Sequence, residues 1–182
     1  MNLLTQVITI AAVIVGAVVT YATNSATERS RHRRQLQIRW DERNLEAYAD
    51  YIGKVRSCIY SAVRLYESPR EPDSPGGQWG QLLDALTAAE GQRAVAFERV
   101  MLLANDQVIE KAHEVNMAAA RIDWAARRRI ECSLEEWRSL HRAVFAAINR
   151  LHQCARQDLK VPGLFISDQH TGRGLTLPDS DQ

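Results

Sequence analysis

The chain has 182 residues, and its 23 Lys and Arg against 22 Asp and Glu give a net charge of only +1. A chain of this length fits one modest domain with an appendage. Such a balanced charge argues against a whole-chain nucleic-acid binder, which is usually strongly basic. The charges are unevenly placed, because none of them precedes Glu28.

The first predicted element is a membrane-spanning helix over residues 3–22. This run of 20 residues, LLTQVITIAAVIVGAVVTYA, contains no charged residue, no His and no Pro. A helix of that length is about 30 Å long, which matches the hydrocarbon core of a bilayer. A buried core helix usually has a shorter apolar run, and a cleaved signal peptide would have a basic segment ahead of it. We therefore expect an uncleaved signal anchor over residues 1–23.

A basic segment follows, and we predict a juxtamembrane stalk over residues 24–40. Basic residues that flank a span stay in the cytoplasm, so the predicted orientation in a bacterial cell membrane has the N-terminus outside and the rest of the chain in the cytoplasm. Anionic lipid headgroups would also attract these side chains, although topology alone is a sufficient reason for them. The stalk arginines are Arg29, Arg31, Arg33, Arg34 and Arg39.

Small residues recur at every fourth position within the predicted span, at Ala12, Gly16 and Thr20. Such a row lies on one helix face and permits the close approach of a second helix. It is a hypothesis for homo-oligomerisation, since runs rich in Ala and Val often contain such rows by chance.

Proline placement divides the rest of the chain. Three prolines between residues 68 and 78 indicate a linker, and the next proline is Pro162. The predicted helices cover residues 41–67, 79–104, 106–130 and 134–159. Because these segments have similar lengths and short connections, they favour an antiparallel four-helix bundle over residues 41–160. Residues 161–182 lack a helical period, and we predict that they are disordered.

The predicted helices differ in how clearly they begin. Asn105 is a suitable N-cap for the third helix, and Ser133 with Glu136 forms a capping box for the fourth. If the chain did not break at Asn105, the second and third helices would be one bent helix in a three-helix body. The residues predicted to face inward, by helical spacing, are Leu45, Tyr48, Ile52, Val55, Ile59, Ala62 and Tyr66; Leu82, Leu86, Ala89, Ala96, Val100 and Leu103; Val108, Ala112, Val115, Ala119, Ile122 and Ala126; and Trp137, Leu140, Val144, Ile148 and Leu151.

Two short motifs lie near the ends of the predicted bundle. They are Arg39-Trp-Asp-Glu-Arg43, with Tyr48 shortly after it, and Ala155-Arg-Gln-Asp-Leu159. With the preceding span and stalk, they resemble a group of uncharacterised small single-pass membrane proteins of bacteria with GC-rich genomes. The resemblance implies the layout of span, stalk and helical bundle, and it implies no activity, cofactor or functional residue.

Candidate chemistry is sparse. Glu110 and His113 have the Glu-x-x-His spacing of di-iron bundles, but those sites need two such motifs and two further glutamates. His141, His152 and Cys154 add no partner at a matching spacing. The sequence also lacks the glycine-rich phosphate-binding motifs and the GxSxG elbow of hydrolases. We therefore predict no catalytic residue, no metal site and no cofactor.

These features together predict a membrane-anchored helical module that binds a partner or acts as a scaffold. The expected partners are an anionic bilayer, an unidentified protein and a second copy of the chain, and no nucleic acid. One alternative is a membrane-tethered, metal-dependent enzyme that uses Glu110 and His113. Another is a phage- or plasmid-associated membrane protein of the holin or spanin type. Three widely spaced cysteines are typical of a reducing compartment.

Overall fold

The computed structural model describes the backbone of residues 3–69 and 77–170. Side chains are described from residue 37 onward in these ranges, Gln169 excepted, and before that for Tyr21, Glu28 and Gln35. In the described ranges the chain is all-α and has no strand. The elements are α1 (Leu3–Glu67), α2 (Gln78–Leu103), α3 (Asp106–Ala126), α4 (Leu134–Asp158) and a short 3-10 helix, η1 (Ser167–His170).

The chain divides into two compact units, Met1–Glu42 and Arg43–Gln182. The first unit contains the start of α1, which is continuous over the predicted span and stalk. Among the residues whose side chains are described, no helix is long and apolar enough to cross a membrane. The predicted span over residues 3–22 lies outside those residues, apart from Tyr21, whose side chain is exposed.

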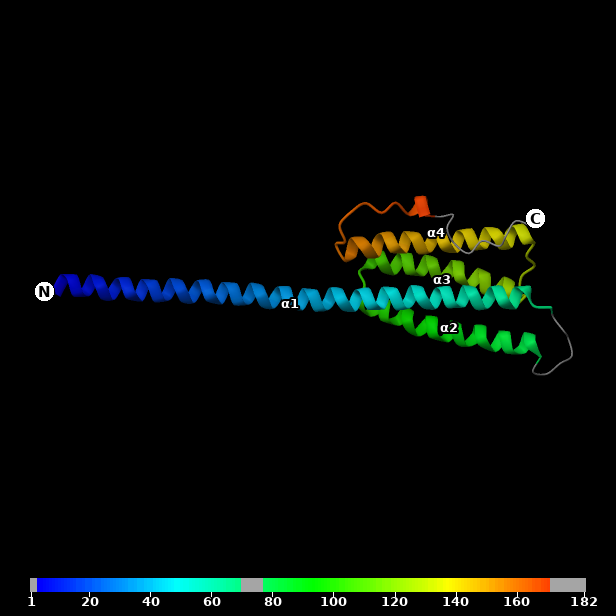
Figure 1. The fold of residues 1–182 in the computed structure, drawn as a ribbon, viewed down its shortest axis with the longest axis horizontal. Helices are drawn as coiled ribbons and strands as arrows, with labels where there is room; N and C mark the ends of the chain where they lie inside the picture. Colours follow the sequence, from blue (N-terminus) through cyan, green and yellow to red (C-terminus); the bar gives the residue numbers. More distant parts are fainter. Residues whose placement is uncertain (1–2, 70–76, 171–182) are drawn as a thin grey trace. The chain divides into compact units, whose positions relative to one another are not determined.

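The second unit is a four-helix bundle formed by α2, α3, α4 and α1 from residue 43 onward. Successive helices run in opposite directions (Figure 1). The backbone leaves helical geometry at Ala104, and Asn105 caps α3 by accepting a hydrogen bond from the backbone amide of Val108 at 3.0 Å. The single bent helix is thereby excluded. The prediction of an all-α bundle with four helices is confirmed.

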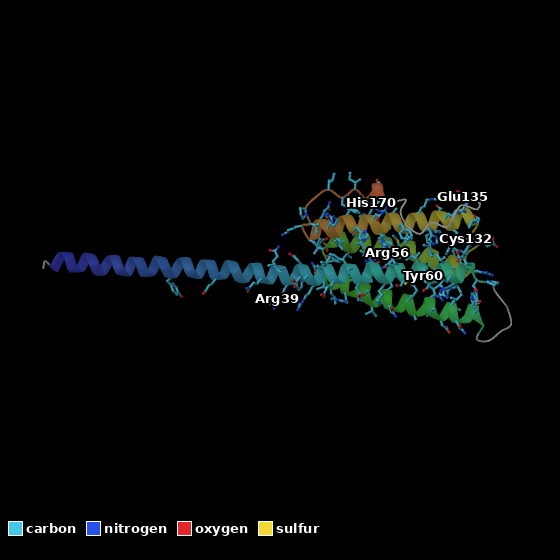
Figure 2. The ribbon with its side chains drawn as sticks, viewed as in Figure 1. Arg39, Arg56, Tyr60, Cys132, Glu135 and His170 are labelled. Carbon is cyan, nitrogen blue, oxygen red and sulfur yellow. The ribbon has the colours of Figure 1, made fainter. Side chains whose placement is uncertain are left out.

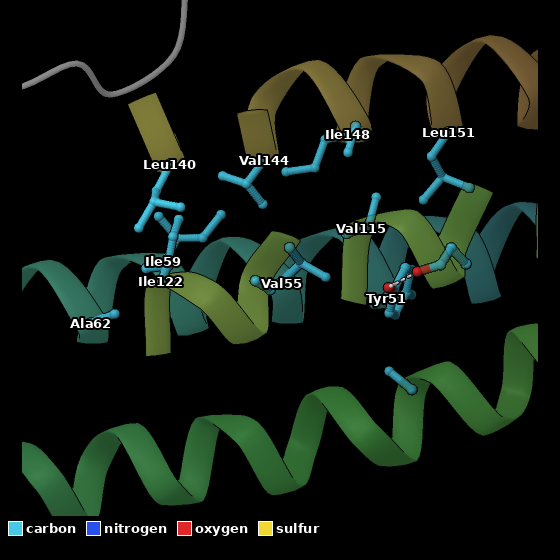
Figure 3. Packing of buried hydrophobic residues seen from close by; sticks show 14 of the residues in the cluster. Tyr51, Val55, Ile59, Ala62, Val115, Ile122, Leu140, Val144, Ile148 and Leu151 are labelled. Atoms are coloured by element: carbon cyan, nitrogen blue, oxygen red, sulfur yellow. Dashed lines mark hydrogen bonds between the residues drawn. The ribbon is translucent and has the colours of Figure 1, made fainter. Parts of the chain in front are cut away.

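The hydrophobic core lies along the axis of this bundle. Figure 3 shows Val55 of α1, Val115 of α3 and Val144 of α4 among the side chains that pack together, and all three are fully buried. At one end, the ring of Tyr66 stacks on Trp137 with their centroids 4.0 Å apart. Each large apolar side chain buried in this way stabilises the fold by about 1.5–3 kcal/mol.

The predicted inward residues of α3 and α4 are confirmed, since every one of them is buried. The prediction is wrong for Leu45 of α1, which is 57% exposed. At that level α1 instead turns Asn44 and Ala47 inward, because the apolar stripe drifts around a helix that has 3.6 residues per turn. Half-buried, rather than buried, are Ile52, Tyr66, Ala89 and Leu103.

Two helices end in a backbone geometry that the sequence did not indicate. Arg128 has a φ of +56°, and the amides of Arg128 and Arg129 donate to the carbonyls of Ala125 and Trp124 at 3.0 and 2.8 Å. This left-handed closure ends α3 at residue 126 instead of 130. Lys160, with a φ of +53°, closes α4 in the same way. Glycine is the usual residue at such positions, so the sequence contained no glycine that would have predicted the C-terminal end of either helix.

Part of the predicted disordered tail is ordered. The η1 helix packs against α4, and Ser167 within it is buried. The ring of Phe165 holds this segment, because it stacks on His170 with centroids 4.7 Å apart and lies 5.7 Å from the Arg156 guanidinium. The structure thus describes a short helix at residues 167–170, in a segment where the absence of a helical period led us to expect disorder. Residues 171–182 lie outside the described chain.

Candidate functional sites

Most residues of the predicted stalk and dimer row lie outside the described side chains. Arg39 is the exception, and its side chain is exposed at the start of the second half of α1 (Figure 2). Its neighbour Trp40 is 50% exposed. The others, about whose side chains nothing is described, are Arg29, Arg31, Arg33 and Arg34 in the stalk and Ala12, Gly16 and Thr20 in the span.

The Glu-x-x-His pair has no metal-binding companions in the described part of the chain. Glu110 and His113 are both exposed on α3. The ring of His113 contacts the ring of Phe97 on α2 edge-on, with centroids 5.0 Å apart. Among the residues described, no three His, Cys, Asp or Glu side chains gather closely enough to hold a metal ion. The structure therefore adds no ligand to the two that the sequence offered.

Tyr48, which follows the first sequence motif, meets the second motif at one end of the bundle. The hydroxyl of Tyr48 on α1 donates a hydrogen bond to Asp158 Oδ2 at the end of α4, at 2.6 Å. The side-chain amide of Asn105, between α2 and α3, donates to Oδ1 of the same carboxylate, also at 2.6 Å. Burial, and then the bond to Asp158, raises the pKa of Tyr48, so its hydroxyl remains a donor at neutral pH. We call these three residues the Asp158 junction.

A polar network crosses the core between α1, α2 and α3. The hydroxyl of Tyr51 lies 3.0 Å from the carbonyl oxygen of Ala112 and 2.9 Å from Asn116 Oδ1. Arg93 of α2 donates to the same amide oxygen and pairs with Glu90 at 2.6 Å. Arg93 keeps Glu90 as its partner within α2, so sliding α2 along the bundle would break the bond from Arg93 to Asn116 of α3. That bond favours one seating of α2, and we call Tyr51, Glu90, Arg93 and Asn116 the Arg93 network.

Cys58 lies on α1 beside this network and is only 3% exposed. Burial, and then the charge of Glu90, raises the pKa of its thiol to about 12. Since the thiolate is the reactive form, Cys58 is unreactive at neutral pH in this structure. Next to it lies a packing gap too small for a water molecule, which Leu86 and Glu90 of α2 and Asp123 of α3 also line.

A surface pocket of about 550 Å³ lies near the ends of α1 and α3, away from the Asp158 junction. The hydroxyl of Tyr66 donates to the carbonyl oxygen of Cys132 at 3.4 Å, and Arg128 donates to that of Ser68 at 3.3 Å. Burial raises the pKa of the Cys132 thiol, so it is not an activated nucleophile. The pocket is lined by Tyr66, Ala125, Arg128, Ile130, Glu131 and Cys132, a set without a histidine to act as its base.

Two apolar side chains are exposed on one face of α3. Met117 and Trp124 are 65% and 46% exposed. They are seven residues apart and so share that face. Exposed apolar side chains that lie on one face often mark protein-binding surfaces, and methionine adapts well to different partners. We call these two residues the Met–Trp surface.

Comparisons with protein-family models, with curated proteins and with solved structures found no match to this chain. The resemblance to small single-pass membrane proteins therefore stays a prediction. The Asp158 junction, the Arg93 network and the Met–Trp surface were not identified from the sequence. The sequence contained a partial indication of the junction alone, because Tyr48 and the motif that contains Asp158 were both noted in it.

Proposed function

We propose that this chain is a membrane-anchored helical module that binds a partner protein through its bundle. The observation that carries the proposal is the distribution of charge, in which 20 residues without charge precede a cluster of five arginines. Such a run is long enough to cross a bilayer, and the arginines favour a cytoplasmic bundle. The continuity of α1 supports this reading, since a spanning segment must satisfy its own backbone hydrogen bonds.

The binding role is supported by the second unit. The Met–Trp surface exposes one aromatic and one methionine side chain whose contact with water is unfavourable. Burying them against a partner would remove this apolar area from water, and aromatic anchors of this kind dominate many interfaces. Within the Asp158 junction, and separately within the Arg93 network, the polar side chains form hydrogen bonds with one another. These groups therefore stabilise the bundle.

The anchor is tested by placing charge in the proposed span. Two adjacent substitutions, Val13→Arg and Ile14→Arg, lie near its centre, where each arginine costs about 2.5–3.5 kcal/mol. We expect alkaline carbonate to leave the wild-type chain in the membrane pellet and to extract the double variant. Leu164→Arg, at a position that is 89% exposed in the second unit, is the control and should behave as wild type. Extraction of the wild-type chain would overturn the anchor.

The orientation is tested separately with reporters fused after Gln182. A fluorescent protein that folds only in the cytoplasm should be bright, and alkaline phosphatase, which needs an oxidising compartment, should be inactive. The reverse pattern would show that the bundle lies outside the cytoplasm.

The binding role is tested by a photoreactive residue placed at Met117 in living cells. We expect a discrete crosslinked species that disappears when Trp124→Asp is introduced in the same chain. A probe at Tyr60, which is 57% exposed on α1, is the matched control and should give no such species. The same crosslinked species from both positions, or its persistence in the Trp124→Asp variant, would argue against the Met–Trp surface.

A further inference from the structure

Helix α2 contributes much less to the core than its neighbours. Four of its 26 residues are buried, against eight of 21 in α3 and eight of 25 in α4. Stabilisation grows with the apolar area removed from water, so α2 is the least strongly held of these three helices. The buried residues of α2 are Leu82, Leu86, Ala96 and Val100, whereas those of α4 include Trp137, Leu140, Val144, Ile148 and Leu151.

The ion pair that joins α2 to α1 costs little to break. Arg99 lies 3.4 Å from Asp50 of α1, and both side chains are more than a third exposed. Exposed pairs of this kind contribute little to stability. Arg93 and Glu90 are more buried, but their ion pair lies within α2 and would leave with it. The bond from Arg93 to Asn116 of α3 would be exchanged for hydrogen bonds to water. The return of these charged side chains to water would offset part of the lost packing, because charged groups regain hydration.

The other three helices hold one another independently of α2. The ring stack of Tyr66 on Trp137 joins α1 to α4, and the bond from Tyr51 to the carbonyl oxygen of Ala112 joins α1 to α3. Helix α3 packs far more extensively against α4 than against α2. Figure 3 shows side chains from α1, α3 and α4 interdigitating in this part of the core.

We infer that α2 undocks as a unit from α1 and α3 while the other three helices stay packed, so that it acts as a lid over the α1–α3 face containing Cys58. The uncovered face includes Ile59 of α1 with Ala119 and Ile122 of α3, which line the packing gap beneath α2. The inference concerns the bundle alone and does not depend on whether residues 3–22 cross a membrane.

The thiol of Cys58 reports this opening directly, because α2 covers it in the closed state. The experiment uses the full chain in detergent micelles with Cys132→Ser and Cys154→Ala, which leaves Cys58 as the one cysteine. The rate of its reaction with Ellman's reagent, relative to a free thiol, measures the fraction of open molecules. We expect an opening constant at least about tenfold larger than the global unfolding constant from urea titration. Equal constants would overturn the inference.

Two buried leucines provide matched variants. Leu82 of α2 and Leu140 of α4 are 7% and 8% exposed, and both belong to the core. Leu82→Ala should accelerate the labelling of Cys58 by about 30-fold or more, because removing such a side chain weakens packing strongly. Leu140→Ala should lower global stability and accelerate the labelling by no more than about fourfold, because in that variant only the added global unfolding exposes Cys58. Equal acceleration by both, or none by Leu82→Ala, would show that α2 does not open alone.

Amide hydrogen exchange of the unsubstituted chain tests the same inference if Leu82→Ala does not fold. A single undocked helix is marginally stable in water, so the amides of α2 should exchange at least about tenfold faster than the central amides of α3 and α4. Uniform protection across the three helices would overturn the inference.

Discussion

Asp158 occupies a position that the helix dipole disfavours. The C-terminal end of a helix carries partial negative charge, so a carboxylate there is repelled. Asp158 is nevertheless the last residue of α4, and hydrogen bonds from Tyr48 and Asn105 compensate it. Its role is therefore to join helix ends: α1, α4 and the turn between α2 and α3 meet at one carboxylate.

Removal of the Tyr48 hydroxyl tests this role. Tyr48→Phe keeps the ring and loses the bond to Asp158, so we expect the free energy of unfolding to fall by about 1–2 kcal/mol. Urea titration followed by circular dichroism at pH 7 measures the change. Tyr60→Phe, at an exposed tyrosine of the same helix, should leave stability unchanged. A Tyr48→Phe variant as stable as wild type would show that the junction does not hold the helix ends.

Two glycines should respond in opposite ways to alanine. Gly91 lies inside α2, and a methyl group there would meet no atom within 4 Å. Gly91→Ala should therefore raise the free energy of unfolding by about 0.5–1 kcal/mol, since alanine favours helix. Gly163 has a φ of +94°, which strains any side chain, so Gly163→Ala should lower it by up to about 1 kcal/mol. Thermal melts of both variants measure the two signs, and a shared sign would contradict the local backbone argument.

At the scale of the helix, the termini that could be predicted from the sequence are those capped by a side chain. Asn105 and Ser133 both cap helices as expected, because a side-chain oxygen bonds to a backbone amide two or three residues later. The ends closed by a left-handed residue were missed, since Arg128 and Lys160 are unusual there. The terminus of a helix can thus be predicted from the sequence only where a nearby side chain of a typical capping residue bonds to the backbone there.

The capping box of α4 should contribute measurably to stability. The backbone amide of Ser133 donates to Glu136 Oε2 at 2.8 Å, and the amide of Glu136 donates to Ser133 Oγ at 3.2 Å. Ser133→Ala removes the second bond and should lower the free energy of unfolding by about 1 kcal/mol. Ser139→Ala, at an exposed position inside the same helix, is the control and should be neutral or slightly stabilising. Equal effects from both would show that the cap contributes nothing specific.

At the scale of the whole molecule, two histidines couple stability to pH. Burial lowers the pKa of His141, outweighing its bond to the carbonyl oxygen of Trp137. Burial, and then the nearby charge of Arg56, also lowers the pKa of His152. An unfolded histidine titrates near 6.5. Below that pH the unfolded chain therefore binds protons that the folded chain does not, and stability is lost as the pH falls from about 6.5 toward the folded pKa values.

Urea titrations at pH 7.5, 6.5 and 5.5 should show this loss. Below pH 6.5, His141→Leu should reduce the change in free energy of unfolding with pH by up to about 1.4 kcal/mol per pH unit, because the side chain that titrates is removed. Val144→Ala, a core substitution on the same helix, should lower stability at every pH and keep the wild-type slope. An unchanged slope in His141→Leu would assign the pH dependence to other groups.

Residue spacing in the sequence was sufficient to predict an all-α bundle, the approximate bounds of its helices and the inner faces of α3 and α4, but it left three helices and four as alternatives. These features depend on spacing within one helix and on bonds between residues three or four positions apart, which local physics controls. The sequence also contains the uncharged run and the arginine cluster from which the anchor is proposed. The inner face of α1 was predicted less well, because Tyr51 and Leu65 fall between the steps of the stripe and are nevertheless fully buried.

Which residues of different helices meet depends on how the core packs. Tyr48 and Asp158 are 110 positions apart, and Arg93 and Asn116 lie on separate helices. No local period encodes such pairs, because they depend on the rotation and register that each helix adopts when the core packs. The same packing decides that α2 buries few side chains and that the Met–Trp surface stays exposed. The helices together have more apolar surface than the core can bury, so some apolar side chains stay exposed.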